Sequence, residues 1–214
     1  MIKDVFLLYT DRFDFFLQCT LEHLTLSLAA IMIAVFLGLG LGILMAQMPR
    51  VSRLLIGIIS VVYTIPSIAL LGFLIPFTGV GDTTALIALV VYGLLPMTRN
   101  TYLGIRGIDP PVIEAAYGMG STDTEVLFRI KLPLAVPVIL GGIRNMAVMT
   151  VSLAGVASFI GAGGLGVAIY RGITTNNPAM TLTGSLLIAV IALIFDFSFG
   201  VLDKRYRRKR RLPS

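Results

Sequence analysis

Five long runs of apolar residues constrain the fold of this chain more than any other sequence feature. The runs cover residues 24–46, 54–77, 83–97, 134–160 and 179–202. A helix needs about 20 apolar residues to cross a hydrocarbon core of about 30 Å, so four runs are long enough and the third is short. Only 13% of the 214 residues are charged, whereas soluble domains carry about a quarter. We therefore predict an all-α integral membrane protein with about five transmembrane helices.

The distribution of Lys and Arg predicts how these helices are oriented. Thirteen of the 17 basic residues fall between the first and second runs, between the third and fourth runs, or after the fifth run. Cytoplasmic segments of membrane proteins carry the excess of Lys and Arg. We expect the N-terminus outside and the C-terminus inside.

Two end segments flank the predicted transmembrane domain at 24–203. Residues 1–23 place aromatic side chains between acids, which is typical of an amphipathic segment at the outer membrane interface; an unstructured tail is the alternative. The segment does not resemble a signal peptide, because it lacks a small-residue cleavage site. Residues 204–214 hold seven Lys and Arg, which favours contact with anionic lipids of the inner leaflet over binding of nucleic acid.

The predicted inner loop at 99–133 holds most of the polar chemistry. Asp109 is followed by two prolines, which predicts the start of a short helix, since an acid caps the N-terminus and proline is tolerated in the first turn. The helix should end near Gly118 or Gly120, because glycine readily adopts the left-handed conformation.

A second short helix should follow in the same loop. Thr122 and Glu125 have the spacing of a capping box. We expect Leu132–Pro133 to end this second helix and to turn the chain back into the membrane. The two helices would then lie flat against the inner surface.

In this loop Glu114-Ala115-Ala116 is followed after three residues by Gly120, after nine more by Ile130, and after one more by Leu132-Pro133. With this spacing the loop, at about 109–133, resembles the EAA loop of ABC importer permeases. Segments 63–81, 85–105, 133–145 and 158–166 are similar to the osmoprotectant permeases, which serve importers of glycine betaine, choline and carnitine. The resemblance covers residues 24–199 and implies a type I ABC importer-like permease with cytoplasmic EAA coupling helices. It assigns coupling to the ATPase to Glu114, Ala115, Ala116, Gly120, Ile130, Leu132 and Pro133.

The resemblance also implies partners and a mechanism. Such permeases pair as homodimers or with a sister permease in the bacterial cell membrane, and each copy rests on a cytosolic ATPase subunit that binds ATP and Mg²⁺. An extracellular or periplasmic solute-binding protein delivers the solute, and the permease pair moves it by alternating access. This chain would bind no cofactor itself.

No enzyme active site is evident in the sequence. A phosphate-binding loop is excluded because no Gly-Lys dipeptide occurs, and no serine lies in a hydrolase elbow. His23 is the only histidine, and we expect it at the membrane interface. Cys19 is the only cysteine, so we expect neither a disulfide within the chain nor a multi-cysteine metal site.

The glycine-rich string at 161–166 fits the G-x-G-x-x-G pattern of dinucleotide-binding loops. It follows a predicted membrane span rather than a strand, which excludes that interpretation. In the resembling permeases the string is an outer loop near the docked binding protein. We expect Gly161, Gly163, Gly164 and Gly166 to contribute to an outer gate and to binding-protein docking; a purely structural turn is the alternative.

Polar groups inside the predicted spans are further candidates, because they are costly in a bilayer. Arg144 and Asp196 fall in the inner halves of the fourth and fifth runs. They could pair across the bundle, face an inner water-filled vestibule, or extend separately to the headgroups. Pro66, Gly72 and Pro76 interrupt the second run and predict a kinked helix. Other groups that could line the translocation pathway are Tyr63, Thr64, Ser67, Tyr92, Ser152 and Ser158.

Two other functions stay open. A type I ABC permease for another small solute, such as methionine or another amino-acid derivative, would share the size and the EAA loop. A secondary transporter or channel would work without ATP, but it predicts internal repeats that we do not find. The chain has no Trp and its 7 Tyr are dispersed, so we expect the aromatic cage for a quaternary ammonium group in the binding protein.

Overall fold

The structure is a computed structural model that describes residues 2–210. Residues 211–214, the end of the predicted basic tail, lie outside the described part, as does residue 1. Every regular element in that part is helical, which confirms the predicted fold class. The elements are α1 (Ile2–Asp11), α2 (Phe13–Gln47), α3 (Pro49–Tyr63), α4 (Ser67–Thr78), α5 (Asp82–Arg106), α6 (Pro110–Gly118), α7 (Asp123–Glu125), the π-helical η1 (Val126–Lys131), α8 (Leu132–Ala154), the 3₁₀ turn η2 (Gly155–Ile160), α9 (Gly166–Thr174) and α10 (Pro178–Arg210).

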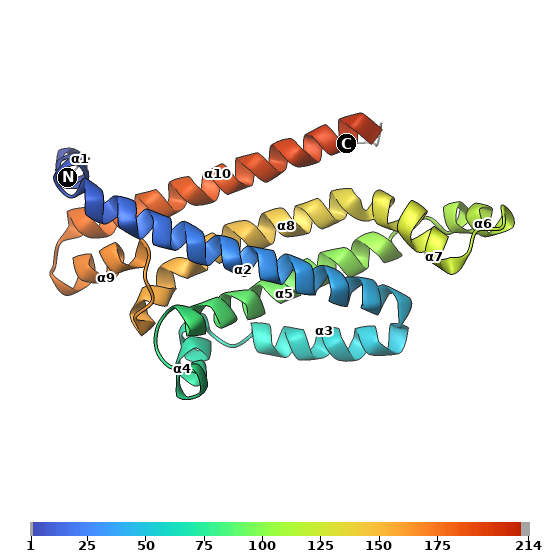
Figure 1. Ribbon diagram of the computed structural model, residues 1–214, viewed down its shortest axis with the longest axis horizontal. Helices are drawn as coiled ribbons and strands as arrows, with labels where there is room; N and C mark the ends of the chain where they lie inside the picture. The colour runs from blue at the N-terminus through green and yellow to red at the C-terminus, as the bar shows by residue number, and fades with distance from the viewer. Residues whose placement is uncertain (1, 211–214) are drawn as a thin grey trace.

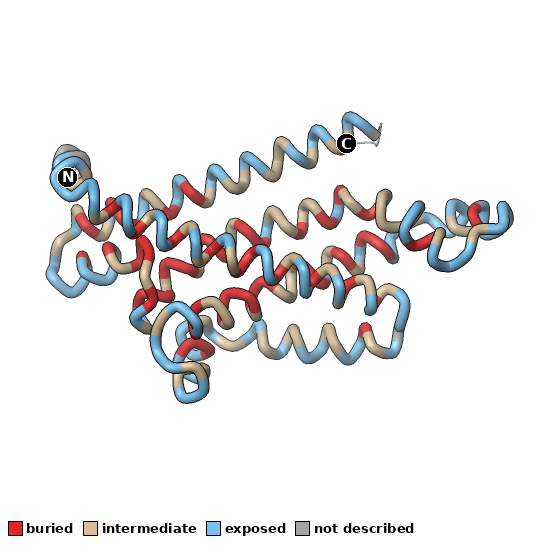
Figure 2. Tube along the Cα trace, viewed as in Figure 1, coloured by how far each residue is buried: buried red, intermediate tan, exposed pale blue. Residues whose placement is uncertain are grey.

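Four long helices, α2, α5, α8 and α10, run side by side and form the body of the molecule (Figure 1). Buried residues concentrate where α2, α5 and α8 face one another (Figure 2). Gly38 lets α2 approach α5 closely, since a Cβ atom there would lie 2.6 Å from Met97 Cγ. Small residues at such contacts are typical of helices that pack in membranes. Large apolar side chains such as Phe36, which is 79% exposed, point outward and suit a lipid environment.

The number of membrane spans agrees with the prediction. Within residues 2–210, four helices are long and apolar enough to cross a membrane, namely α2, α5, the continuous helix from Asp123 to Ile160, and α10. The pair of α3 and α4 brings the number to five if it counts as one span, although the two helices are bent by 98°.

This bend is sharper than the predicted kink in the second apolar run. Helix α3 ends at Tyr63, and α4 begins after Pro66. Proline has no N–H and disfavours the helical conformation of the residue before it, here Ile65, so the helix stops at this point. Gly72 and Pro76 lie inside α4 without ending it.

Helix α2 begins at Phe13, well before the predicted start of the first span at residue 24. Residues 13–23 therefore belong to the same helix as the span, and the predicted end segment 1–23 divides at Arg12 into α1 and the first turns of α2. The helix continues because its buried face continues: Phe16, Cys19 and His23 follow one another at helical spacing and are all buried.

Candidate coupling, gate and pathway sites

The EAA loop forms a hairpin that projects from one end of the bundle (Figure 1). The inner loop predicted at 99–133 begins only after Arg106, because α5 continues to that residue. Helix α6 starts after Asp109 as predicted, although among the described residues the Asp109 carboxylate caps no N–H of α6. The predicted end is confirmed: α6 stops at Gly118, and Gly120 has a φ of +86°, a conformation that glycine tolerates and other residues resist.

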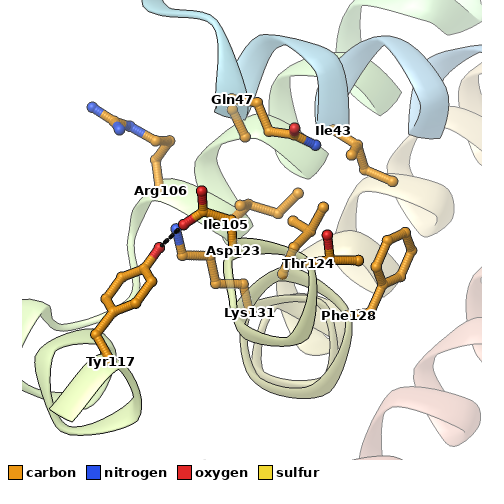
Figure 3. Close-up of a pocket in the computed structure, with 11 residues that line it drawn as sticks. Ile43, Gln47, Ile105, Arg106, Tyr117, Asp123, Thr124, Phe128 and Lys131 are labelled. Carbon is orange, nitrogen blue, oxygen red and sulfur yellow. Dashed lines mark hydrogen bonds between the residues drawn. The ribbon is translucent and has the colours of Figure 1, made fainter. Parts of the chain in front are cut away.

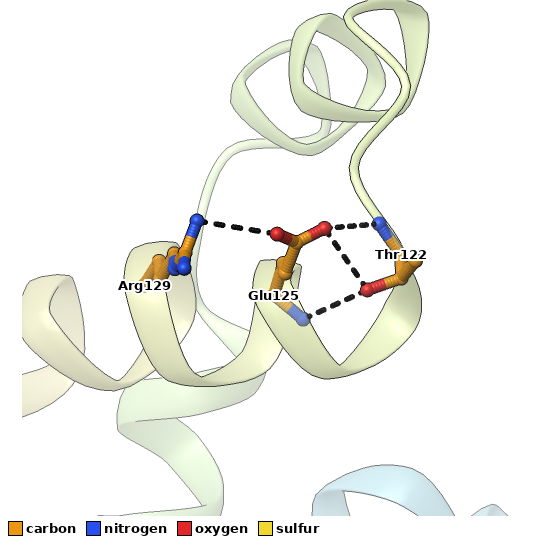
Figure 4. Close-up of polar contacts among 3 residues, drawn as sticks. All are labelled: Thr122, Glu125 and Arg129. Carbon is orange, nitrogen blue, oxygen red and sulfur yellow. Dashed lines mark hydrogen bonds and ion pairs between the residues drawn. The ribbon is translucent and has the colours of Figure 1, made fainter.

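The second arm of the hairpin begins with the predicted capping box (Figure 4). Thr122 Oγ1 accepts a hydrogen bond from the Glu125 N–H at 3.4 Å, and Glu125 Oε2 accepts one from the Thr122 N–H at 3.1 Å. Arg129 adds an ion pair with Glu125 Oε1 at 3.2 Å. The box satisfies N–H groups that the first turn of a helix otherwise leaves open.

The predicted helix end at Leu132–Pro133 is wrong. Elements α7, η1 and α8 run on as one helix from Asp123, so the second arm continues into the span instead of lying flat as a separate helix. Pro133 lies in the first turn of α8, directly after the wider π-helical turn η1. Pro133 lacks the N–H that a regular helix would bond to the C=O four residues earlier, and the irregular turn before it lets the helix continue past the proline ring without the clash that would break a regular helix.

The predicted coupling residues fall into two groups on this hairpin. The tip presents small and acidic side chains to its surroundings, while Ala116 is 1% exposed and packs inside the hairpin. At the base, the hydroxyl group of Tyr206 on α10 donates a hydrogen bond to the Pro133 C=O at 2.9 Å. Exposed at the tip are Glu114, Ala115 and Gly120, and half-buried at the base are Ile130, Leu132 and Pro133.

A pocket of about 470 Å³ lies beneath the hairpin, between the ends of α2 and α5 and the elements α6, α7 and η1 (Figure 3). Across it the Tyr117 hydroxyl donates to Asp123 Oδ1 at 2.7 Å and fastens the two arms together. This hydrogen bond to the carboxylate raises the pKa of the Tyr117 phenol. Arg106 and Lys131 also line the pocket.

The glycine loop at 161–166 lies at the opposite end of the molecule (Figure 1). Gly161 and Gly164 have φ values of +75° and +92°, and Gly166 is buried against the backbone of Gly155. The N–H groups of Gly163 and Gly164 donate to the carboxylates of Asp82 and Glu22, respectively. In the sequence both acids stand out only as charges on the predicted outer side, because no local pattern signals a contact between distant segments.

The structure places His23, which the sequence predicts at the membrane interface, inside the protein rather than on its surface. The side chain is 0% exposed, and its Nε2 lies 3.0 Å from the C=O of Val151. Because a carbonyl oxygen only accepts, the proton is assigned to Nε2. Cys19 is buried one turn away, and in residues 2–210 no three His, Cys, Asp or Glu side chains gather as a metal site.

The two tyrosines predicted to line the pathway, Tyr63 and Tyr92, lie in contact with each other. The rings of Tyr63 and Tyr92 pack edge to face with their centroids 5.8 Å apart. The Tyr92 hydroxyl group donates to the C=O of Ile65 in the break between α3 and α4, and the Tyr63 hydroxyl lies 3.2 Å from Met149 Sδ. Ser67 borders a small cavity next to Tyr92. Tyrosines that are dispersed in the sequence are therefore partly gathered by the fold.

The remaining pathway candidates form hydrogen bonds within their own helical segments. The hydroxyl groups of Thr64, Ser152 and Ser158 each donate to a nearby backbone C=O, at 2.7, 2.9 and 3.2 Å. Serine and threonine commonly satisfy themselves in this way inside helices.

Arg144 of α8 and Asp196 of α10 form a two-pronged ion pair. Nε and Nη2 of Arg144 donate to Oδ1 and Oδ2 of Asp196, each at 2.6 Å. The side chains are 42% and 39% exposed, so the pair lies at the edge of the helix packing rather than in the core. The two side chains thus pair with each other across two predicted spans.

The fold is a bundle of four or five candidate membrane-crossing helices with a hairpin that projects from one end, and the family match identifies its class as a transport permease. Residues 38–208 match the family described as binding-protein-dependent transport system inner membrane component. The chain belongs to this family; it is a multi-pass inner-membrane permease subunit of an ABC transporter and is not itself an ATPase.

Individual relatives cover almost the whole chain. It is 41% identical to the carnitine transport permease protein OpuCB of Listeria monocytogenes, over 89% of this chain and 87% of that one. It is 36% identical to the glycine betaine/carnitine/choline transport system permease protein OpuCB of Bacillus subtilis (strain 168), over 88% and 87%. A chain of the inward-facing MetNI methionine ABC transporter shares the fold, with a TM-score of 0.83 at 22% identity over 90% of this chain and 96% of that one.

Proposed function

We propose that this chain forms the translocation pathway of an ATP-driven importer of quaternary ammonium osmoprotectants such as glycine betaine, choline and carnitine. The observation that carries the proposal is the 36% and 41% identity to permeases named for these solutes. Each solute bears a permanent cation, which crosses a lipid bilayer slowly and needs a protein pathway. The likeness to the methionine transporter, at 22% identity, concerns the fold alone.

Tyr63 and Tyr92 are the side chains best placed to contact a passing cation. Aromatic ring faces attract quaternary ammonium groups. Tyr63 is 39% exposed and within reach of a solute, whereas Tyr92 is 7% exposed and supports it from behind. Two rings make only part of a cage, so we infer weak binding along the permease and tight recognition by a separate solute-binding protein.

We infer that the hairpin end of the molecule is cytoplasmic. The start of α3, the end of α5, the hairpin and the end of α10 lie at this end (Figure 1), and these segments carry most of the Lys and Arg. The positive-inside rule favours this orientation. The glycine loop then faces outward, where a binding protein docks and where we propose that the loop forms part of the outer gate.

Helix α6 is the element that we propose to contact a cytosolic ATPase subunit. It projects beyond the bundle with Glu114 and Ala115 exposed, and the second arm of its hairpin is continuous with α8. A displacement of α6 would therefore reach the span through the short turn at Gly120 and the Tyr117–Asp123 hydrogen bond that joins the two arms. ATP binding to the partner ATPase shifts the equilibrium between the inward-facing and outward-facing states only to the extent that these states bind ATP with different affinities.

A second permease, which is a copy of this chain or a sister chain, completes the translocation pathway. The ion pair of Arg144 and Asp196 holds two spans together at the inner end of the pathway.

The proposal is tested by uptake into vesicles that contain this permease with its ATPase and its binding protein. We expect saturable uptake of at least one of glycine betaine, choline and carnitine, and we expect uptake to require the binding protein. Failure to take up any of the three with the full set present would assign the permease to another solute class. Saturable micromolar uptake without the binding protein would place the recognition site in the permease.

A further inference from the structure

Two carboxylates from different helices hold the glycine loop at 161–166. Asp82, the first residue of α5, accepts a hydrogen bond at Oδ1 from the Gly163 N–H at 3.1 Å. Glu22 of α2 accepts one at Oε2 from the Gly164 N–H at 3.0 Å. Consecutive N–H groups of one loop are thus bound by two helices that belong to separate spans.

Neighbouring contacts orient these carboxylates. Gln18, one turn before Glu22, donates from Nε2 to Glu22 Oε1 at 2.9 Å and leaves Oε2 for the loop. The N–H of Gly81, next to Asp82, donates to the C=O of Ile160 at 2.9 Å, directly before the loop. The loop is therefore tied at its entry and at its centre.

The glycines are needed for these contacts and not only for the turn. A Cβ atom at position 163 would lie 2.5 Å from Glu22 Oε2, and one at position 164 would lie 3.2 Å from His23 Nδ1. Gly164 also has a φ of +92°, which side chains other than glycine resist. A larger residue at position 163 would displace the Glu22 carboxylate, and one at position 164 would crowd the backbone of His23 in α2.

Burial differs between the loop and the groups that hold it. Ala162 and Leu165 are 2% and 0% exposed, so the loop packs into the protein. Glu22 and Asp82 are exposed. Hydrogen bonds to a charged acceptor are stronger than neutral ones, yet an exposed carboxylate that loses its partner is hydrated again and leaves no buried charge behind. Such contacts hold a segment firmly and still release it.

We propose that Glu22 and Asp82 act as positioning residues that latch the glycine loop and set how readily it undocks. This inference rests on the proposed role of the loop in the outer gate. Opening of that end requires the loop to move away from α2 or α5, and both carboxylate contacts break when it does. Weakening either contact shifts the loop toward the undocked state without touching the translocation pathway.

The latch is tested by the accessibility of Ala162, which the docked loop buries. Ala162→Cys in a Cys19→Ala background is labelled from outside with a membrane-impermeant maleimide, using the complete transporter without ATP. We expect Glu22→Ala and Asp82→Ala each to raise the labelling rate about tenfold, equivalent to about 1.4 kcal/mol. Glu22→Gln keeps an oxygen acceptor in place and should raise it less. Asp14→Ala, which removes an exposed acid from the same helix α2, should leave the rate unchanged.

Equal labelling rates in Glu22→Ala, Asp82→Ala and Asp14→Ala would overturn the latch. Hydrogen exchange of the amides at 161–167, measured without the engineered cysteine, tests the same undocking should Ala162→Cys fail to assemble: exchange that is no faster in the two latch variants also overturns it. Faster labelling with unchanged uptake would support the latch and refute the gate role of the loop, so the two ideas fail separately.

Discussion

At the scale of single residues, the Arg144–Asp196 pair shows how a charged side chain is accommodated in a predicted span. Arg144 alone would be costly at membrane depth, but its paired hydrogen bonds to Asp196, both at 2.6 Å, neutralise it. Each side chain remains about 40% exposed (42% and 39%), so the pair lies at the edge of the helix packing. There it joins α8 to α10.

A charge swap tests whether this pairing matters for transport. Arg144→Asp and Asp196→Arg each place like charges opposite one another, and we expect each single change to lower uptake per assembled complex severalfold. The double swap restores opposite charges and should recover part of the loss, which uptake measurements on matched amounts of complex can detect. A double variant no better than the worse single variant would show that pairing is not the reason for the loss.

At the scale of elements, local patterns predicted the structure correctly, and patterns whose outcome depends on packing did not. The capping box of Thr122 and Glu125 and the turn at Gly120 involve only near neighbours, so the sequence predicted both. Leu132–Pro133 has the appearance of a helix end, but the π-helical turn before it lets the helix continue. Pro66 predicted a break in the second apolar run, but no local pattern gave the 98° angle between α3 and α4.

The turn of the coupling hairpin gives a matched test at this scale. Gly120 has a φ of +86°, whereas Gly118 lies in helical conformation, and a Cβ atom would meet nothing within 4 Å at either position. Gly120→Ala should therefore strain the turn by about 1–2 kcal/mol, and Gly118→Ala should not. We expect reduced co-purification of the ATPase and reduced uptake only for Gly120→Ala, with a larger effect for Gly120→Trp. Normal assembly and uptake in Gly120→Trp would refute the docking role.

At the scale of the whole molecule, composition predicted more of the architecture than of the sites. The apolar runs identified a membrane protein of about five spans because burial in lipid requires long apolar helices. The contacts between Glu22 and Gly164 and between Tyr63 and Tyr92 join segments far apart in the chain. Such contacts arise only when the helices pack, so single-sequence patterns could name Tyr63 and Tyr92 as polar candidates but could not bring them together.

The orientation of the molecule is tested by labelling two exposed threonines at its opposite ends. Thr83 lies near the start of α5 and Thr124 lies in the hairpin. In a Cys19→Ala background, an impermeant reagent added to intact cells should label Thr83→Cys and should reach Thr124→Cys only after the membrane is permeabilised. The reverse pattern would invert the assignment of the coupling and gate ends.

The dependence of uptake on ATP tests the central claim most directly. Proteoliposomes that contain this permease, its ATPase and its binding protein are loaded with ATP and Mg²⁺ or left without nucleotide, and are offered glycine betaine, choline, carnitine or methionine. The account predicts accumulation of at least one quaternary amine only in vesicles with ATP on the side of the hairpin, and none of methionine. Equal accumulation of a quaternary amine with and without ATP would contradict it.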